Sequence, residues 1–236
     1  MIRRYSLFPI LLIFLVIPYF VFSQSKDQTN ESMVWVEVIE SIKVNECFSA
    51  TFLWHHRTFL EREQTHQDIF WVSGNMKVAK HFTLTGGLIY FKYHKLSVGT
   101  YLSLPEMRPF QALTYTTKLG KWKTSFRTMV EQRYLSKVQQ GEILDGHQFN
   151  WRFRNRIRVS YPLTERFILE ISEEFLFNGS KIAVDFFSQN RATARLHYKV
   201  GSFDINMGYF HWLVNTKSEM QHRHTLMLGL SHKLKL

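Results

Sequence analysis

The chain has 236 residues, which fits one domain once an N-terminal leader is removed. Hydrophobic residues make up 45% and aromatic residues 16%, but beyond the N-terminus no apolar run reaches the roughly 18–20 residues that a membrane helix needs. The net charge of +11 leaves nucleic acid, an anionic membrane surface and an acidic ligand open as partners, and the single cysteine, Cys47, excludes an internal disulfide.

Residues 1–23 (MIRRYSLFPILLIFLVIPYFVFS) have the composition of a signal peptide. Arg3 and Arg4 form a positively charged start, and a long apolar region follows them. Small residues before the polar segment suit cleavage near Ser23, which would begin the mature chain at Gln24. We therefore expect export.

A retained signal anchor is the alternative, because the apolar run is long enough to span a membrane. Pro18 and the polar segment SQSKDQTNES favour cleavage. The mature chain would then hold 28 basic and 19 acidic residues, a net charge of +9. Export excludes a cytosolic nucleic-acid binder, so no nucleic-acid partner is expected. Cys47 is expected to be a small packed residue rather than a nucleophile.

Side chains alternate with period two along the mature chain, most clearly at residues 148–163 (QFNWRFRNRIRVSYPL). Only a β-strand sends successive side chains to opposite faces, because on a helix the two sets would mix around the axis. One face of this strand would carry the apolar set and the other would carry the arginines: Phe149, Trp151, Phe153, Ile157, Val159 and Tyr161 against Arg152, Arg154, Arg156 and Arg158.

The same alternation recurs in KWKTSFRTMVEQRYL, RFILEISEEFLF, QNRATARLHYKV and HTLMLGLSHKLKL. Short turns alternate with longer polar links, and this alternation is typical of an up-and-down antiparallel meander. The longer links are expected at 61–67, 97–104, 138–147, 179–186 and 216–221. We expect ten strands, at about 48–59, 68–79, 81–95, 106–119, 121–136, 148–163, 165–178, 187–200, 202–215 and 222–236.

The first segment after the leader, residues 24–47, is harder to place. It holds an eleventh candidate strand, MVWVEVIESIKV at 33–44, which breaks the even strand count of bacterial membrane barrels. This strand could run inside the barrel, cover one end, or pair with an unrecognised strand to make twelve. We therefore predict a barrel over residues 48–236 of ten strands, with twelve as the alternative.

Two barrel types alternate in this way. A soluble barrel points its apolar face inward, whereas a transmembrane β-barrel points it into lipid and keeps charges in the lumen. Several segments run about 12–15 residues, longer than the usual 5–6 of soluble strands and enough for the roughly 9–11 of a membrane strand. Together with the leader, this predicts an all-β, antiparallel, transmembrane barrel in the cell outer membrane.

Arginines in a narrow lumen need partners, because a desolvated charge is costly unless it is paired. The neighbouring strands supply glutamates within reach of cross-strand pairing. We therefore predict an internal ladder of arginines and glutamates, formed by Arg127, Glu131, Arg133, Arg152, Arg154, Arg156, Arg158, Glu170, Glu174, Arg191 and Arg195.

A series of segments resembles the uncharacterised family DUF2490 in order and spacing. They are EMRPFQALTYT (106–116), RTMVEQRYL (127–135), WRFRNRIRVSYPL (151–163), EEFLFN (173–178), QNRATARLHYKV (189–200), INMGYFHW (205–212) and the closing HRHTLMLGLSHKL. The resemblance covers about residue 33 to the end. It implies an outer-membrane β-barrel of bacteria, of the Bacteroidota in particular, and it implies no activity.

Two histidine groups could carry chemistry. Asp145 and His147 in LDGHQF could activate a water molecule, as in barrel proteases, but a polar loop tip is the simpler interpretation. His222 and His224 share one strand face and could share a metal ion, yet no third ligand is identifiable. The Gly86–Gly87 pair is expected to relieve crowding or mark a bulge.

The sequence thus predicts an outer-membrane barrel protein with a structural or binding role and a charged lumen. A hydrolase acting on lipid or peptide at the outer rim and a narrow anion-selective channel are the alternatives. No catalytic residue, metal or cofactor is assigned. The expected partners are outer-membrane lipid and, during insertion, the barrel-assembly machinery, with the ligand unknown.

Overall fold

The computed structural model describes residues 27–61, 64–97, 100–179 and 185–236. The expected signal peptide, residues 1–23, lies outside the described residues. Within those ranges the chain is all β, and none of it forms a helix long and apolar enough to cross a membrane.

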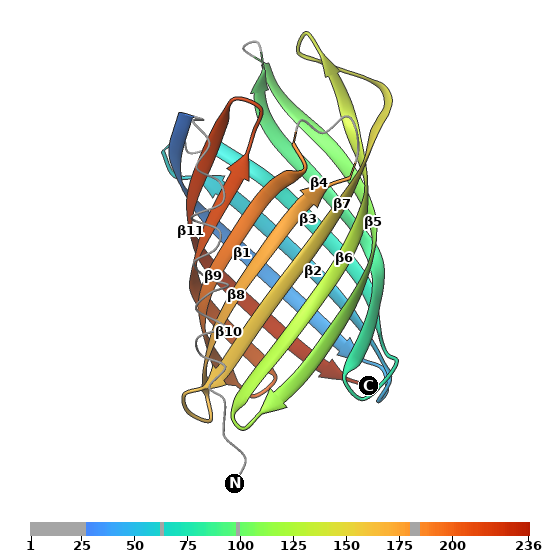
Figure 1. The fold of residues 1–236 in the computed structure, drawn as a ribbon, viewed down its shortest axis with the longest axis vertical. Coiled ribbons are helices and arrows are strands. Elements are labelled where there is room, and N and C mark those ends of the chain that lie inside the picture. The colour runs from blue at the N-terminus through green and yellow to red at the C-terminus, as the bar shows by residue number, and fades with distance from the viewer. Residues whose placement is uncertain (1–26, 62–63, 98–99, 180–184) are drawn as a thin grey trace.

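Eleven tilted strands form a tall wall (Figure 1). They are β1 (Asp27–Lys43), β2 (Phe48–Phe59), β3 (Gln64–Lys77), β4 (Phe82–Ser97), β5 (Thr100–Leu119), β6 (Trp122–Gln139), β7 (Glu142–Pro162), β8 (Phe167–Asn178), β9 (Phe187–Val200), β10 (Phe203–Asn215) and β11 (Glu219–Lys235).

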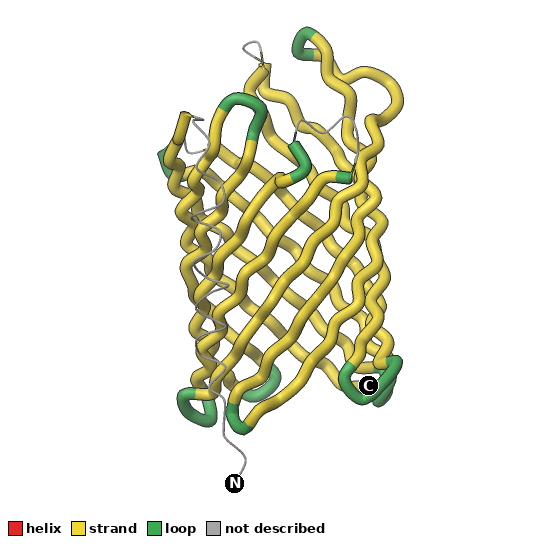
Figure 2. The backbone as a smooth tube through the Cα atoms, in the orientation of Figure 1, coloured by secondary structure: helices red, strands yellow, loops and turns green. Residues whose placement is uncertain are grey.

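The wall is a closed barrel in which each strand lies beside its neighbour in the chain (Figure 2). Ten of the pairings are antiparallel, so the predicted all-β up-and-down barrel is confirmed for β1 to β11. The eleventh pairing closes the barrel between β1 and β11, and it is parallel, from Asp27 opposite Glu219 to Lys43 opposite Lys235.

This parallel seam corrects the predicted strand count. Neither ten nor twelve strands is right, and the strand expected at 33–44 is part of the wall, as β1. The barrel therefore begins at Asp27 rather than at residue 48. A closed barrel needs an even number of strands only when every neighbouring pair is antiparallel, and the one parallel pair here lets an odd number close.

Tight turns join the strands at the lower end of the barrel in Figure 1. The Asn45 side chain accepts hydrogen bonds from the backbone N–H groups of Cys47 and Phe48, both at 2.8 Å, which fixes the β1–β2 turn. Gly120 and Gly201 each adopt a φ of 59°, a left-handed conformation that glycine accepts without strain. Cys47 is exposed in its turn, contrary to the expectation that it is packed.

At the upper end of the barrel in Figure 1, some strands are longer than their neighbours and extend above them. The segments 97–104 and 138–147, expected to be polar links, are mostly strand, because β5 and β7 run for 20 and 21 residues. The β6–β7 hairpin rises above the rest of the barrel (Figure 1). An irregularity between Ser136 and Lys137 interrupts its register. The link expected at 179–186 does separate two strands, β8 and β9, whereas most of the length expected in the other two links belongs to β5, β6 and β7.

The barrel is apolar outside and polar inside. On β7 the Phe153 side chain is 38% exposed, whereas its neighbour Arg154 is 8% exposed and points into the lumen. The alternation predicted for this strand is therefore present, with the aromatic residues outward. The lumen also holds two apolar clusters, which are Met33, Trp35, Phe59, Phe210, Trp212 and Met227, and Ile69, Ile89, Phe91, Phe110, Ala112 and Met129.

Gly87 makes room for one of these clusters. A Cβ atom at this position would lie 2.8 Å from the Phe110 ring and 2.2 Å from the Val72 carbonyl oxygen. The β3–β4 register is regular through Gly86 and Gly87, so the pair marks no bulge. Only Gly87 relieves crowding, because a Cβ atom at Gly86 would meet nothing closer than 4.0 Å.

The seam can be tested by engineered disulfides in a Cys47→Ser background. Val36 lies opposite Leu228 across the β1–β11 seam. We expect Val36→Cys with Leu228→Cys to cross-link on mild oxidation, because paired strands lie about 4.8 Å apart. Gel mobility before and after reduction measures the link.

The control pair is His56→Cys with Leu228→Cys. His56 flanks Val36 on its other side, so two strand spacings, about 9–10 Å, separate it from Leu228. This is beyond the roughly 7 Å that a disulfide allows. Cross-linking of the control pair in place of the seam pair would mean that β1 is absent from the wall.

Candidate binding site in the lumen

Seven charged side chains of alternating sign form a continuous chain of ion pairs across the inner wall. We call this set the ion-pair chain; in order it is Arg133, Glu106, Arg108, Glu131, Arg154, Glu174 and Arg127. The nitrogen–oxygen distances along it run from 2.6 to 3.2 Å. Arg191 joins at Glu174, at 3.6 Å. The chain links β5, β6, β7, β8 and β9 from within.

The ion-pair chain is removed from solvent. Glu131 is 0% exposed and accepts hydrogen bonds from Arg154, at 2.6 Å, and Arg108, at 3.2 Å. Arg108 also donates two hydrogen bonds to the Glu106 carboxylate. Charges this deeply buried are tolerable only when geometry and hydrogen bonding compensate for lost hydration. Each carboxylate here meets two or more guanidinium groups.

The structure places the predicted ladder residues in four different situations. Arg127, Glu131, Arg133, Arg154, Glu174 and Arg191 belong to the ion-pair chain or join it. Arg158 pairs with Glu170 at 3.3 Å, nearer the lower end. Arg195 of β9 pairs with Glu37 of β1, and β10 and β11 lie between these two strands.

Arg152 and Arg156 differ from the other predicted residues. Within the described ranges Arg152 donates to the Ser188 hydroxyl, at 3.2 Å, and to Asn178, at 3.5 Å. Among the residues that the structure describes, neither arginine has a carboxylate at ion-pair distance, and each leaves its Nε without a hydrogen bond. The predicted ladder therefore does not extend to them.

Sequence reasoning missed the glutamate and arginine that anchor one end of the ion-pair chain. Glu106 and Arg108 lie two residues apart on β5, so they share a face. Phe110 and Ala112 follow on the same inward face. Because this face carries both charged and apolar residues, the sequence of β5 shows no regular alternation of polar and apolar residues. The (i, i+2) charge pair in EMRPF was the available signal.

A second interaction crosses the lumen rather than following its wall. Arg195 of β9 donates to Glu37 of β1 at 2.5 Å, although β10 and β11 lie between these strands. Gly208 of β10 makes the crossing possible, because a Cβ atom there would lie 2.7 Å from the Arg195 Cγ. The same Glu37 carboxylate lies 3.3 Å from the His55 ring. Glu37 was missed because β1 could not be placed.

Aromatic rings line the other side of the lumen. The Arg57 guanidinium lies 3.6 Å from the Trp35 ring centroid. The Trp212 ring faces three guanidinium groups, those of Arg57, Arg191 and Arg223, at 5.3, 5.1 and 4.7 Å. Such contacts stabilise a cation more strongly when water is excluded.

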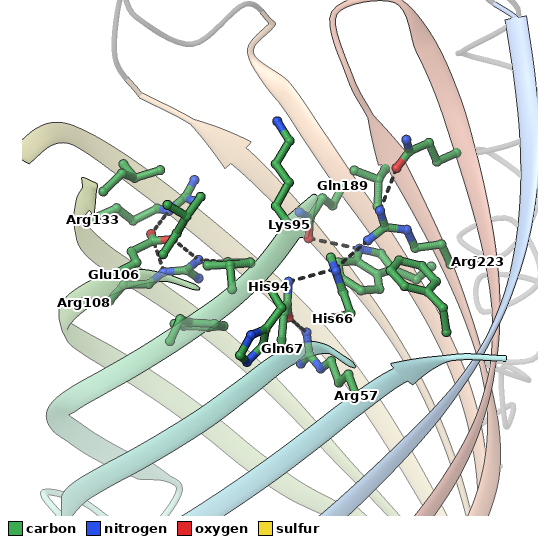
Figure 3. Close-up of a pocket in the computed structure, with 18 of the residues that line it drawn as sticks. Arg57, His66, Gln67, His94, Lys95, Glu106, Arg108, Arg133, Gln189 and Arg223 are labelled. Atoms are coloured by element: carbon green, nitrogen blue, oxygen red, sulfur yellow. Dashed lines mark hydrogen bonds and ion pairs between the residues drawn. The ribbon is translucent and has the colours of Figure 1, made fainter. Parts of the chain in front are cut away.

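Two cavities remain within the described part of the lumen. The upper one, about 640 Å³, reaches the upper strand ends, where Gln64, Lys95 and Gln221 line it. The lower one, about 450 Å³, is lined by Arg156 and Glu170 among others. The ion-pair chain runs from the wall of the upper cavity to that of the lower. Figure 3 shows the upper cavity, with Arg57 and Gln67 at its floor.

The two histidine groups do not form a site. Asp145 and His147 are exposed on the β6–β7 hairpin, with no hydrogen bond described between them. His222 and His224 face outward with His211. The His211 Nε2 atom lies 3.2 Å from the His222 Nδ1 atom, at hydrogen-bond distance. In the described ranges no group of three histidine, cysteine or acidic residues is arranged to hold a metal ion.

The sequence matches the family described as "Protein of unknown function (DUF2490)" over residues 32–223. The chain belongs to this family. The matched region begins within β1 and ends within β11, so it covers β2 to β10 of this DUF2490 barrel in full. It also contains the whole ion-pair chain. No curated protein matches the chain.

The ion-pair chain should be sensitive to removal of its central carboxylate. Glu131→Gln would leave Arg108 and Arg154 each short of a buried partner, and breaking a buried pair costs about 3–5 kcal/mol. We expect the urea midpoint of unfolding to fall accordingly.

Glu142→Gln is the matched control, since Glu142 is exposed on the upper hairpin. Its effect should stay within about 0.5 kcal/mol. Equal midpoints for Glu131→Gln and the parent would show that the ion-pair chain does not hold the barrel together.

Proposed function

We propose that the mature chain is an outer-membrane β-barrel with a binding role, whose lumen is too filled for general diffusion. The observation that carries the proposal is the inverted polarity of the wall, seen in Phe153 facing outward beside the inward Arg154. In water this arrangement would expose apolar surface around the whole barrel, whereas in lipid it is the favourable one.

Polar side chains on the outer face support a lipid environment, because they satisfy one another. Gln132 donates to Gln111 at 3.0 Å, and Thr128 donates to Asn155 at 3.0 Å. The Glu173 carboxyl, only 6% exposed, accepts a hydrogen bond from Asn190. Hydrocarbon offers no hydrogen bonds, so outward polar groups there must find partners within the protein.

Outward aromatic pairs lie close to the lower turns. Phe82 packs on Tyr115 at 5.2 Å between ring centroids, Trp122 on Tyr161 at 4.6 Å, and Phe167 on Tyr198 at 5.0 Å. Aromatic residues gather in this way at the two interfaces of membrane barrels. The short turns would then face the periplasm and the overhanging strands the outside of the cell.

The filled lumen favours binding over conduction. Barrels of about eight strands are filled by side chains, and open pores need about sixteen. In this eleven-stranded barrel, the ion-pair chain and the aromatic rings occupy the inner wall between two separate cavities. This arrangement argues against an anion-selective channel. A rim hydrolase is not favoured either, because Asp145 and His147 make no described contact with each other.

The location is tested by cell fractionation and by heat-modifiable gel mobility of the mature chain in detergent. We expect recovery in the outer-membrane fraction and faster migration of the unheated protein, because a closed barrel stays compact in detergent. Recovery of folded protein in the periplasmic soluble fraction would overturn the proposal.

Conductance is measured separately in planar bilayers. We expect no steady open level from the folded protein, since its lumen is occupied by paired charges. Stepwise conductance that shrinks in Arg154→Gln would replace the binding role with the channel alternative.

A further inference from the structure

The upper cavity carries far more positive than negative charge. Its lining includes seven basic side chains and two acidic ones, namely Arg57, Lys95, Arg108, Arg133, Arg152, Arg191 and Arg223 against Glu31 and Glu106. Some of this excess is balanced by the neighbouring Glu131 and Glu174 of the ion-pair chain. The remaining excess falls on Arg57 and Arg152, which are buried, and on Lys95, which is exposed.

Arg57 and Arg152 are buried without a counter-ion in the described ranges. They are 4% and 5% exposed, and both line the upper cavity. Arg57 donates to the Gln67 side-chain oxygen at 2.6 Å, and Arg152 donates to the Ser188 hydroxyl, so the hydrogen-bond acceptors described for both are neutral. Their Nε atoms have no hydrogen bond. A buried guanidinium in this state is costly, and an anion in the cavity would remove the cost.

Aromatic rings line the same cavity beside these charges. They are those of Trp212 and Phe91, and the Arg108 guanidinium covers the Phe91 ring at 3.7 Å from its centroid. Gln189 accepts a hydrogen bond from the Trp212 ring nitrogen at 3.1 Å, which fixes the orientation of the indole. Fixed rings and fixed donors are the features of a pre-formed ligand site.

We propose that the upper cavity binds a sugar that carries a carboxylate or phosphate group. Arg57 of β2 and Arg152 of β7 would supply the positive charge that holds the anion in the cavity, and the ring of the sugar would pack on Trp212. A cavity of about 640 Å³ is of the size that encloses a small organic ligand. This inference rests on the proposed binding role of the barrel, and it adds the chemical class of the ligand. The ligand would enter from the upper strand ends, where Lys95 rises above the cavity (Figure 3).

The test is isothermal titration calorimetry on the folded mature chain in zwitterionic detergent, with glucuronate, glucose 6-phosphate and glucose as probes. We expect at least one charged sugar to bind about tenfold or more tightly than glucose, because charge-assisted hydrogen bonds add that much. Equal affinity for glucose and both charged sugars would overturn the inference.

Substitutions locate the site. Arg57→Gln and Arg152→Gln should each weaken binding about tenfold or more. Arg156→Gln is the matched control, because Arg156 also lacks a carboxylate partner among the described residues but lines only the lower cavity. Loss of affinity as large in Arg156→Gln would show that general lumen charge, and no local site, holds the anion.

A stability measurement separates a binding role from a structural one. Without ligand, Arg57→Gln and Arg152→Gln should unfold at the same or a higher urea concentration than the parent, since each removes an uncompensated buried charge. With the charged sugar, only the parent should gain stability. Marked destabilisation of both variants without ligand would mean that these arginines serve the fold.

The source of the anion is resolved by lipid composition. In phosphatidylcholine vesicles the charged sugar should bind as in detergent. If binding is lost when phosphatidylglycerol is added, the site takes its phosphate from a lipid headgroup; if binding persists, the ligand is soluble. A protein that is heat-modifiable and in the outer membrane, yet binds neither charged sugar nor anionic lipid, would refute this inference alone.

Discussion

The constraint on which the barrel depends is that charge inside a narrow lumen must be matched by charge. Glu131 lies at the centre of this matching, since it is fully buried and holds guanidinium groups from β5 and β7. Because carboxylates and guanidiniums must meet at hydrogen-bond distance, the wall strands cannot slide past one another without separating several pairs. The same need explains why Gly208 leaves room for Arg195 to reach Glu37 across the lumen. Stability and register are thus set by one network.

The side chains that fill the two sides of the lumen differ in kind. On β5 to β9 the charges neutralise one another in the ion-pair chain, whereas on β1, β2, β10 and β11 tryptophan and phenylalanine rings cover much of the inner surface. The upper cavity is lined by residues of both sides. Arg57 belongs to neither kind, since it is stacked on Trp35 and has no carboxylate among the described residues. An uncompensated buried charge lowers the stability of the fold, and a site keeps such a charge where it serves to bind a ligand.

Much of the fold could be predicted from the alternation of side chains. The strand predicted at 48–59 and that at 187–200 have the observed bounds, because burial on one face imposes period two along their whole length. The placement of β1 could not be predicted, because closure between distant segments leaves no local signal. The ladder prediction brought together Glu131, Arg154 and Glu174, whose alternation is regular. It missed Glu106 and Arg108, where aromatic and aliphatic residues share the inward face, and it included Arg152, whose nearest partners are neutral.

The parallel seam has a consequence for how the chain folds. Every other pairing joins strands that follow one another, so a hairpin turn sets its alignment, but β1 and β11 meet across a separation of 192 residues. No turn fixes the alignment of these two edges, and a slip by one residue would turn every side chain of β1 to the wrong face. Two directly opposed pairs supply the missing alignment, Glu31 with Arg223 inside and Glu40 with His232 outside, each at 2.9 Å. Closure is therefore the slow, non-local event of assembly, and until the last strand arrives β1 remains an open edge that must be protected from pairing with another chain.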